Sequence, residues 1–474
     1  MPAAANSRLI CIATAVASLA VSAAAYLLFY SPAVIRNDDD VDDEQRQRYT
    51  VGLHNPSNDC FANSVLQALS SSSVLESYLA TDRVRQYKLS SALLIMISDL
   101  NTPIRYARAS SPWPFLHVLE SIFKSRISRT QHDAHELMHL ILQTLTDEYA
   151  ATTTTTAGAP PFEGSTLDSI TCQQCFRTTT TSRCKFVVLT LPVPQQSSTT
   201  VQDLLAKLLA PEYVTGYGCQ SCRLAALAGT ARRVVQARNL QADDDDDDDV
   251  GVDVVPKLAG DPVGYYKYVC KLANSAASMT ADLPAEIEHD LPRTVRSTIV
   301  RQTSLHDLPG LLIVQLSRSI FDGHASSRND CAVQVSEFIT LYSSAGVSSL
   351  LYSAATTTTT TAGDDDGLAN KKTYRLVGMI RHSGTHSAGH YECYKRKPPQ
   401  ASTATERLAG GPQQPRQRQW WRISDEKVWQ VSTSEVLKQT GTAYMLVYET
   451  VPIAQQQRRR RKTTKQRQQD LNKI

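Results

Sequence analysis

The sequence predicts a mixed α+β fold from three observations. Helical apolar patterns occupy the first half of the folded part of the chain, and strand-like runs occupy the second half. Helices followed by strands, rather than alternating with them, favour an antiparallel sheet over a parallel one. Polar, low-complexity segments interrupt this pattern, and we interpret them as surface insertions into one domain because loops tolerate long insertions at modest entropic cost.

Three segments have the apolar spacing of helices: Cys60–Ser71, Leu89–Leu100 and Thr130–Leu145. The third opens on the T-x-x-D pattern of a capping box, formed by Thr130 and Asp133. Strand-like runs come later in the chain. They are "FVVLTLPV" from Phe186, "GLLIVQL" from Gly310, "TYRLVGMIRH" from Thr373, "HYECYKR" from His390, "WWRISD" from Trp420 and "AYMLVYE" from Ala443.

Composition excludes some classes of function. The chain has 474 residues, of which 42% are hydrophobic, so it can bury a sizeable core. A net charge of +3 gives no global attraction to nucleic acid, and no nucleic-acid partner is expected. The 10 cysteines, four of them in two C-x-x-C pairs, do not resemble a dense disulfide framework and indicate a reducing compartment.

The N-terminus predicts a membrane anchor. After the tail of residues 1–8, the segment Leu9–Tyr30 is uncharged, and about 20 apolar residues suffice to cross a bilayer as a helix. A cleaved signal peptide is the alternative, but the apolar run continues beyond its small residues. An acidic linker, residues 31–48, follows and is expected to be solvated.

Residues 49–450 are expected to form one catalytic domain. Biased insertions that cannot pack interrupt it at residues 152–160, 243–249, 356–367 and 397–419. Residues 451–474 form a basic tail with the run "RRRRK", for which disorder is the expectation.

Cys60 and His390 are the candidates for chemistry. Cys60 stands where a helix is expected to begin, and backbone N–H groups at such an end stabilise a thiolate. Position alone does not distinguish a nucleophile from a structural thiol, so a partner base is required. His390 opens a strand after a loop of small residues. Ser424 and Asp425 end another strand, where they are expected to orient an imidazole through Nδ1.

Two C-x-x-C pairs have the spacing of a structural zinc site. Four thiolates bind Zn²⁺ tetrahedrally and leave no open position, so the metal would be structural and not catalytic. Free thiols or a site that has lost its metal are the alternatives. The four cysteines are Cys172, Cys175, Cys219 and Cys222.

These motifs, in this order, resemble the ubiquitin-specific proteases. The resemblance lies in "GLHNPSNDCFANSVLQALS" around Cys60, "QHDAHEL", the C-x-x-C pairs, "LPGLLIVQLSR", "GHYECY" and "AYMLVYE". It covers Tyr49 to Glu449 and implies a papain-like fold with a helical thumb, an antiparallel palm and zinc-ribbon fingers that grip ubiquitin. It also implies that Cys60 is the nucleophile, His390 the general base and Asn55 an oxyanion donor.

The third member of the catalytic triad stays open between two residues. Most members of the family carry Asp or Asn there, whereas Ser424 holds the aligned position here and Asp425 follows it. A subset of the family uses serine, including a mitochondrial outer-membrane member with an N-terminal anchor. The resemblance therefore predicts a single-pass protein of that membrane, with the endoplasmic reticulum as the rival and the catalytic domain in the cytosol.

The predicted function is hydrolysis of isopeptide and peptide bonds at the C-terminal glycine of ubiquitin, without a catalytic cofactor. Ser57 and Asp59 depart from the Gly and Thr common in the family, and a carboxylate facing the sulfur would raise the thiol's pKa. The alternative is therefore a weak or inactive ubiquitin-binding scaffold. A secreted papain-like protease is a further alternative, against which the zinc-type cysteines count.

Overall fold

The structure is a computed structural model that describes residues 50–102, 104, 106–124, 133–150, 159–179, 182–238, 260–274, 283–321, 326–344, 371–384, 389–396 and 420–451. The expected anchor, the acidic linker and the basic tail after Val451 lie outside these residues, as do most of the biased insertions. The chain divides into two compact units: Met1–Thr155 with Ile380–Thr433, and Thr156–Met379 with Ser434–Ile474.

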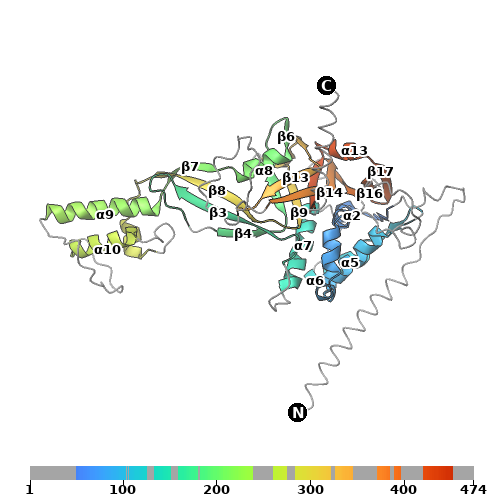
Figure 1. The fold of residues 1–474 in the computed structure, drawn as a ribbon, viewed down its shortest axis with the longest axis horizontal. Helices are drawn as coiled ribbons and strands as arrows, with labels where there is room; N and C mark the ends of the chain where they lie inside the picture. The colour runs from blue at the N-terminus through green and yellow to red at the C-terminus, as the bar shows by residue number, and fades with distance from the viewer. Residues whose placement is uncertain are drawn as a thin grey trace, which may run out of the picture. The chain divides into compact units, whose positions relative to one another are not determined.

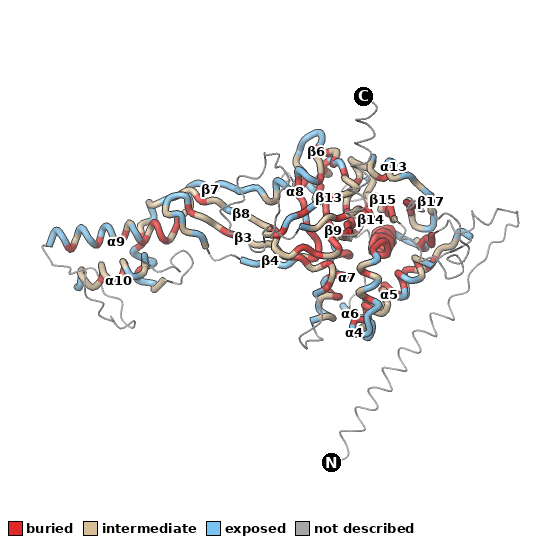
Figure 2. The backbone as a smooth tube through the Cα atoms, in the orientation of Figure 1, coloured by how far each residue is buried: buried red, intermediate tan, exposed pale blue. Residues whose placement is uncertain are grey.

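Helix α2 of the first unit begins at Cys60 and lies in the core of that unit. Every residue of α2 is buried, and Figure 2 shows it red throughout. It packs on α5, α7 and strand β15, and a helix that is apolar on most sides is stable only in such a core. The helices are α2 (Cys60–Leu69), α3 (Ser73–Leu79), α4 (Asp82–Arg85), α5 (Lys88–Asn101), α6 (Trp113–Phe123) and α7 (Ala134–Ala150), most of which are labelled in Figure 1.

The strands of the first unit carry the second half of the predicted site. Here β17, β16, β15 and β14 are neighbours in that order, and β14 contributes its residues from Ile380 onward. A two-residue turn of Asp425 and Glu426 joins β16 to β17, and Asp425 takes φ 53°, a left-handed conformation that aspartate tolerates. The strands are β1 (Gly52–Leu53), β2 (Ala109–Ser110), β14 (Lys371–Gly384), β15 (Gly389–Arg396), β16 (Trp420–Ser424) and β17 (Lys427–Val431).

The described residues of the second unit hold two larger sheets, besides the two-stranded pairs of β10 with β11 and of β6 with β12. One has the order β14, β18, β9, β5, with β13 on β14, and the other has the order β4, β3, β8, β7. Its main strands are β3 (Gly164–Cys172), β4 (Ser182–Phe186), β5 (Leu189–Pro192), β7 (Glu212–Tyr217), β8 (Ser297–Asp307), β9 (Leu311–Ser317), β13 (Phe338–Tyr342) and β18 (Ala443–Thr450). Shorter strands are β6 (Ser198–Thr200), β10 (Ser319–Phe321), β11 (Ser326–Arg328) and β12 (Ala332–Gln334).

The α+β class is confirmed, with one departure in strand direction. Strands β5 and β9 pair in parallel, as do β6 and β12, whereas a mainly antiparallel sheet was expected. The segment from β5 to β9 includes β7, β8 and several helices, so β5 and β9 are joined by a long crossover and not by a hairpin. Such a crossover lets β5 and β9 run in the same direction and pair in parallel.

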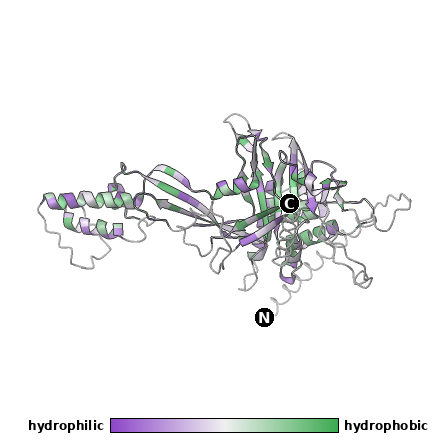
Figure 3. Cartoon of the chain, turned by 45° about the horizontal axis from the view of Figure 1, so that its top comes forward, coloured by the Kyte–Doolittle hydropathy of each residue, from purple (hydrophilic) through white to green (hydrophobic). Residues whose placement is uncertain are grey.

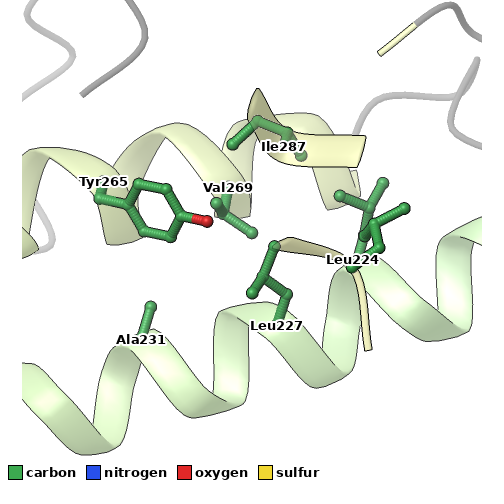
Figure 4. Packing of buried hydrophobic residues seen from close by; sticks show 7 residues of the cluster. Leu224, Leu227, Ala231, Tyr265, Val269 and Ile287 are labelled. Atoms are coloured by element: carbon green, nitrogen blue, oxygen red, sulfur yellow. The ribbon is translucent and has the colours of Figure 1, made fainter. Parts of the chain in front are cut away.

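The helices α8, α9, α10 and α11 of the second unit were not expected, because the second half of the chain was interpreted as strand-rich. Leu224, Leu227 and Ala231 follow helical spacing along α9 and pack on Tyr265 and Val269 of α10, with Ile287 of α11 completing the cluster (Figure 4). Figure 3 shows hydrophobic and hydrophilic residues alternating around these helices. The helices of this unit are α8 (Val201–Leu209), α9 (Gln220–Ala237), α10 (Pro262–Asn274) and α11 (Ala285–Asp290), and α13 (Thr433–Leu437) begins at the division between the units.

The expected elements mostly occur, with shifted ends. Helix α2 ends at Leu69 and not Ser71, and α7 continues five residues past the expected Leu145, to Ala150. The expected start at Thr130 lies outside the described residues. Asp133 precedes α7 and accepts a hydrogen bond from the N–H of His135 at 2.8 Å, so its carboxylate caps the described helix.

The localisation prediction is corrected by the helices. In the part of the chain that the structure describes, no helix is long and apolar enough to cross a bilayer. A span needs about 20 predominantly apolar residues. The longest described helix, α9, has 18 and includes Arg223, Arg232 and Arg233. This finding overturns the predicted single-pass protein of the mitochondrial outer membrane, its endoplasmic-reticulum rival and the membrane partner. The segment Leu9–Tyr30 itself lies outside the described residues.

Candidate active site

Cys60 is the first residue of α2 and is 5% exposed. The loop before it is shaped by Asn55, whose Oδ1 accepts hydrogen bonds from the backbone N–H groups of Ser57 at 3.3 Å and Asp59 at 2.9 Å. The backbone oxygen of Asp59 then accepts the N–H of Asn63 and starts the helix. The loop before Cys60, which is rich in Asn, Pro and Ser, thus forms a compact turn that places the thiol at the start of the helix.

Burial raises the pKa of the Cys60 thiol above its usual range. The backbone N–H of Tyr391 opposes this, the charge of Asp425 raises the pKa further, and the N–H groups at the start of α2 lower it. The helix N-terminus lowers the pKa of Cys60, as predicted. The pKa is nevertheless raised overall, because the desolvation of the sulfur has the larger effect. The acidic side chain that acts on the thiol is Asp425, whereas the sequence pointed to Asp59.

This raised pKa predicts how Cys60 reacts with a small electrophile. Alkylation by iodoacetamide is expected to accelerate about tenfold for each pH unit from pH 7 to 9, because only the thiolate reacts and its fraction rises in that proportion below the pKa. Asp425→Asn should move the profile to lower pH, because it removes a negative charge near the sulfur. Mass spectrometry of the Cys60 peptide measures the rate, and a plateau below pH 8 would contradict the prediction.

His390 faces Ser424 through Nε2. The distance from His390 Nε2 to Ser424 Oγ is 2.8 Å, whereas Asp425 Oδ2 lies 4.0 Å from the same nitrogen. The sequence-based expectation of contact through Nδ1 was therefore wrong: the two residues meet across neighbouring strands β15 and β16, with Nε2 turned to Ser424. Nδ1 is then the ring nitrogen that is not engaged with Ser424, and it is the one that can accept a proton from a thiol. The residue after His390, Tyr391, reaches Cys60 with its backbone N–H.

Gly389 is required by its surroundings. A Cβ placed on it would clash with His382 Nε2 and would lie 2.6 Å from the backbone oxygen of Ser383. Any side chain would push β15 away from β14 directly beside His390. Small residues precede His390 in the sequence. At Gly389, where the loop meets β15, the reason is steric, because there is no room for a side chain.

Asp425 is held by two amides. Asn55 Nδ2 donates to Asp425 Oδ2 at 2.9 Å, and Asn63 Nδ2 donates to Oδ1 at 2.8 Å. The backbone oxygen of Asp425 also accepts the N–H of Leu53 at 2.9 Å. The carboxylate therefore links the loop before Cys60, helix α2 and the end of β16. Sequence reasoning missed Asn63, although a fully buried asparagine inside the apolar face of α2 is a signal that a polar partner faces it.

The four predicted metal ligands come together in the second unit. Their sulfur atoms lie within 4.8 Å of one another, with 3.6 Å between Cys172 and Cys222 and 3.7 Å between Cys175 and Cys219. A tetrahedral Zn²⁺ with Zn–S bonds of about 2.3 Å places its sulfurs about 3.8 Å apart, so the residues fit the metal. Cys172 ends β3 and Cys219 caps α9, so the cluster fastens a strand to a helix.

Charge within the cluster is uneven. The pKa of Cys222 is raised by burial and by its hydrogen bonds with the other three cysteine side chains. Burial acts in the same direction on Cys172, but N–H groups of the knuckle and the Ser297 hydroxyl outweigh it and lower its pKa to about 6. The Cys172 thiolate is thus favoured, while Cys219 and Cys222, whose pKa values are raised, hold their protons. A divalent cation removes this conflict, because it stabilises all four thiolates together.

Comparison with known proteins identifies the family. The family model described as "Ubiquitin carboxyl-terminal hydrolase" matches residues 51–448. The chain belongs to this family. It is 27% identical to ubiquitin carboxyl-terminal hydrolase 16 of Emericella nidulans over 81% of this chain and 68% of that protein, and 27% identical to ubiquitin carboxyl-terminal hydrolase 16 of Saccharomyces cerevisiae over 85% and 89%. It is a thiol-dependent deubiquitinase.

A solved structure of the family supports the fold. The SAGA Ubp8/Sgf11/Sus1/Sgf73 DUB module bound to ubiquitin aldehyde matches with a TM-score of 0.53 and 18% identity, over 87% of this chain and 71% of that one. The predicted papain-like arrangement of the ubiquitin-specific proteases is thereby confirmed. Helices α2 to α7 correspond to the thumb, the eight-stranded sheet that contains β14 to the palm, and the sheet β4-β3-β8-β7 with its cysteine cluster to the fingers.

Proposed function

We propose that Cys60, His390 and Ser424 form the catalytic triad of this deubiquitinase, with Asn55 and Asp425 serving the oxyanion. The observation that carries the proposal is the 2.8 Å contact between His390 Nε2 and Ser424 Oγ, which leaves Nδ1 for the thiol. The 4.0 Å distance of Asp425 from the same nitrogen supports Ser424 as the residue that orients the imidazole.

Asp425 has a different role in this proposal. An asparagine amide has two N–H donors, and Asn55 gives one of them to Asp425 Oδ2. The other is the donor that stabilises the negative oxygen of the tetrahedral intermediate. Because the carboxylate fixes the amide before the substrate arrives, the donor needs no reorientation when charge develops.

The reaction is acyl transfer. His390 takes the proton of the buried Cys60 thiol, the thiolate attacks the carbonyl carbon of ubiquitin's C-terminal glycine, and Asn55 donates to the oxygen that becomes negative. Protonated His390 then gives its proton to the leaving lysine amine. Water, deprotonated by His390, hydrolyses the thioester and restores the thiol. The raised pKa of the free thiol makes this proton transfer part of the attack.

Zinc is proposed as a structural metal of the fingers. Cys172, Cys175, Cys219 and Cys222 would hold it through four thiolates, which leaves no position for a substrate or a water. When bound, it supplies folding free energy and no chemistry. The residues on either side then present a fixed surface to ubiquitin.

The proposed nucleophile is tested with ubiquitin that carries an electrophile on its C-terminal glycine. The full chain is expected to gain one ubiquitin through Cys60, the Cys60→Ala variant none, and Cys184→Ser, a change at an exposed cysteine, the same amount as wild type. Mass spectrometry of the adduct locates the bond. Ubiquitin binding by the wild type without adduct formation would support the inactive scaffold instead.

A further inference from the structure

Glu392 is a buried carboxylate that none of the proposed catalytic steps uses. It lies on β15 and is 5% exposed. Its carboxylate lies 3.0 Å from Arg381 Nε on β14 and 2.8 Å from Arg422 Nη2 on β16. Since β15 lies between these two strands, one side chain spans three neighbouring strands.

This group stands next to the proposed acid and base. Glu392 follows His390 by two residues and Arg422 precedes Ser424 by two, and alternate residues of a strand point to the same face. The backbone pairing of β15 with β16 runs from Arg396 with Trp420 to Cys393 with Ile423. His390 and Ser424 lie past the end of that run. The contact between Glu392 and Arg422 is therefore a side-chain link between β15 and β16 at that end of the run, on the side of His390 and Ser424.

Both arginines are also held from their other sides. Arg381 donates to Ser383 Oγ at 2.8 Å and to the Tyr394 hydroxyl at 3.4 Å. The guanidinium of Arg422 lies 5.2 Å from the centre of the Trp429 ring. Their positions are thus determined by more than the carboxylate, and the carboxylate is in turn fixed by them.

The charges make this arrangement sensitive to a small change. A carboxylate taken out of water is stabilised here by two guanidinium groups, and removing one partner of such a buried set leaves the remaining charges uncompensated. Without the negative charge, two positive groups face each other across β15. Their repulsion acts on the strands that carry His390 and Ser424.

We propose that Glu392 is a positioning residue, which holds His390 and Ser424 at hydrogen-bonding distance by bridging the arginines of the two strands beside β15. The inference rests on the triad proposed above. A misplacement of about 1 Å in a catalytic group costs about 10²-fold in rate, so a small shift of these strand ends is visible in turnover.

The test uses the full chain with Glu392→Gln, which keeps the shape of the side chain and removes its charge. Turnover per active site, titrated with the ubiquitin electrophile, is expected to fall by about 10-fold to 10²-fold, while KM for a ubiquitin conjugate stays within about twofold. The rate of Cys60 alkylation by iodoacetamide should not change. Glu392→Asp, which keeps the charge on a shorter chain, should recover part of the turnover, and Glu435→Gln, a change at an exposed glutamate, should have wild-type values.

The outcomes separate the two proposals. If wild type forms the adduct at Cys60 and Glu392→Gln has wild-type turnover, the positioning role is wrong and the triad stands. If both Glu392 variants have a lower turnover, a higher KM and a smaller folded fraction, the role is merely structural and the proposal is overturned. If wild type forms no adduct, the proposed triad fails first.

Discussion

Replacing Asp425 by alanine is expected to lower kcat by about 10²-fold to 10³-fold, as much as the loss of one oxyanion-hole donor. Asp425 accepts an N–H of Asn55 at 2.9 Å, and without it the amide keeps only the two hydrogen bonds to its Oδ1, so its N–H groups are held less firmly toward the developing charge. Asn55→Ala should cost the same. Steady-state kinetics on a ubiquitin conjugate measures both variants.

The double variant sharpens this prediction. Because Asn55 and Asp425 act as one unit, Asn55→Ala with Asp425→Ala should be little slower than either single change. Glu426→Ala is the matched control: this neighbouring acid pairs with His54 in an exposed ion pair, and such pairs contribute little. Ser424→Ala is expected to lose only about 10-fold, since it removes an orienting hydroxyl and no charge. Additive losses at Asn55 and Asp425, or a larger loss at Ser424, would reverse the assignment of roles.

Removing zinc is expected to weaken recognition of ubiquitin and leave the thiol unaffected. In the Cys219→Ser, Cys222→Ser variant, bound zinc should fall from one per chain to none, and KM for a ubiquitin conjugate should rise by about tenfold or more, because structural zinc sites supply folding free energy directly. The alkylation rate of Cys60 should stay at the wild-type value, since Cys60 belongs to the other unit.

Elemental analysis and thermal unfolding check the zinc prediction independently of activity. A chelator should lower the unfolding temperature of wild type and of Cys184→Ser, a variant at an exposed cysteine, but not that of the double serine variant. Purified wild type that contains no zinc and unfolds identically with and without chelator would contradict the structural metal.

The sequence predicted those parts of the site that depend on local pattern. Cys60 at a helix start and the two C-x-x-C pairs were found because short spacings encode a helix end and a metal knuckle. His390 and Ser424 were predicted as partners from their places at strand ends, and the structure brings the two side chains into contact, but through Nε2 and not through the predicted Nδ1. Which ring nitrogen meets a partner depends on how two strands are placed, and spacing along one chain does not contain that.

The contacts that the sequence missed join distant residues. Asn63 and Asp425 lie 362 positions apart, and Arg422 meets Glu392 across strands that flank an insertion. The pKa of Cys60 was misjudged for the same reason: the helix start is a local feature, whereas burial and the charge of Asp425 come from the tertiary fold. The helices α9 to α11 were missed because the second half of the chain was interpreted as strand-rich, whereas these helices form their own cluster of buried residues.

The first unit is assembled from two pieces of chain, Met1–Thr155 and Ile380–Thr433. Synthesis proceeds from the N-terminus, so Cys60 and helices α2 to α7 leave the ribosome long before β15 and β16 have been made. Until then the thiol has no His390, and Asn55 and Asn63 have no Asp425. With the proposed triad, a chain that ends before β15 and β16 lacks its general base, and we expect activity to begin only after β16 has been made.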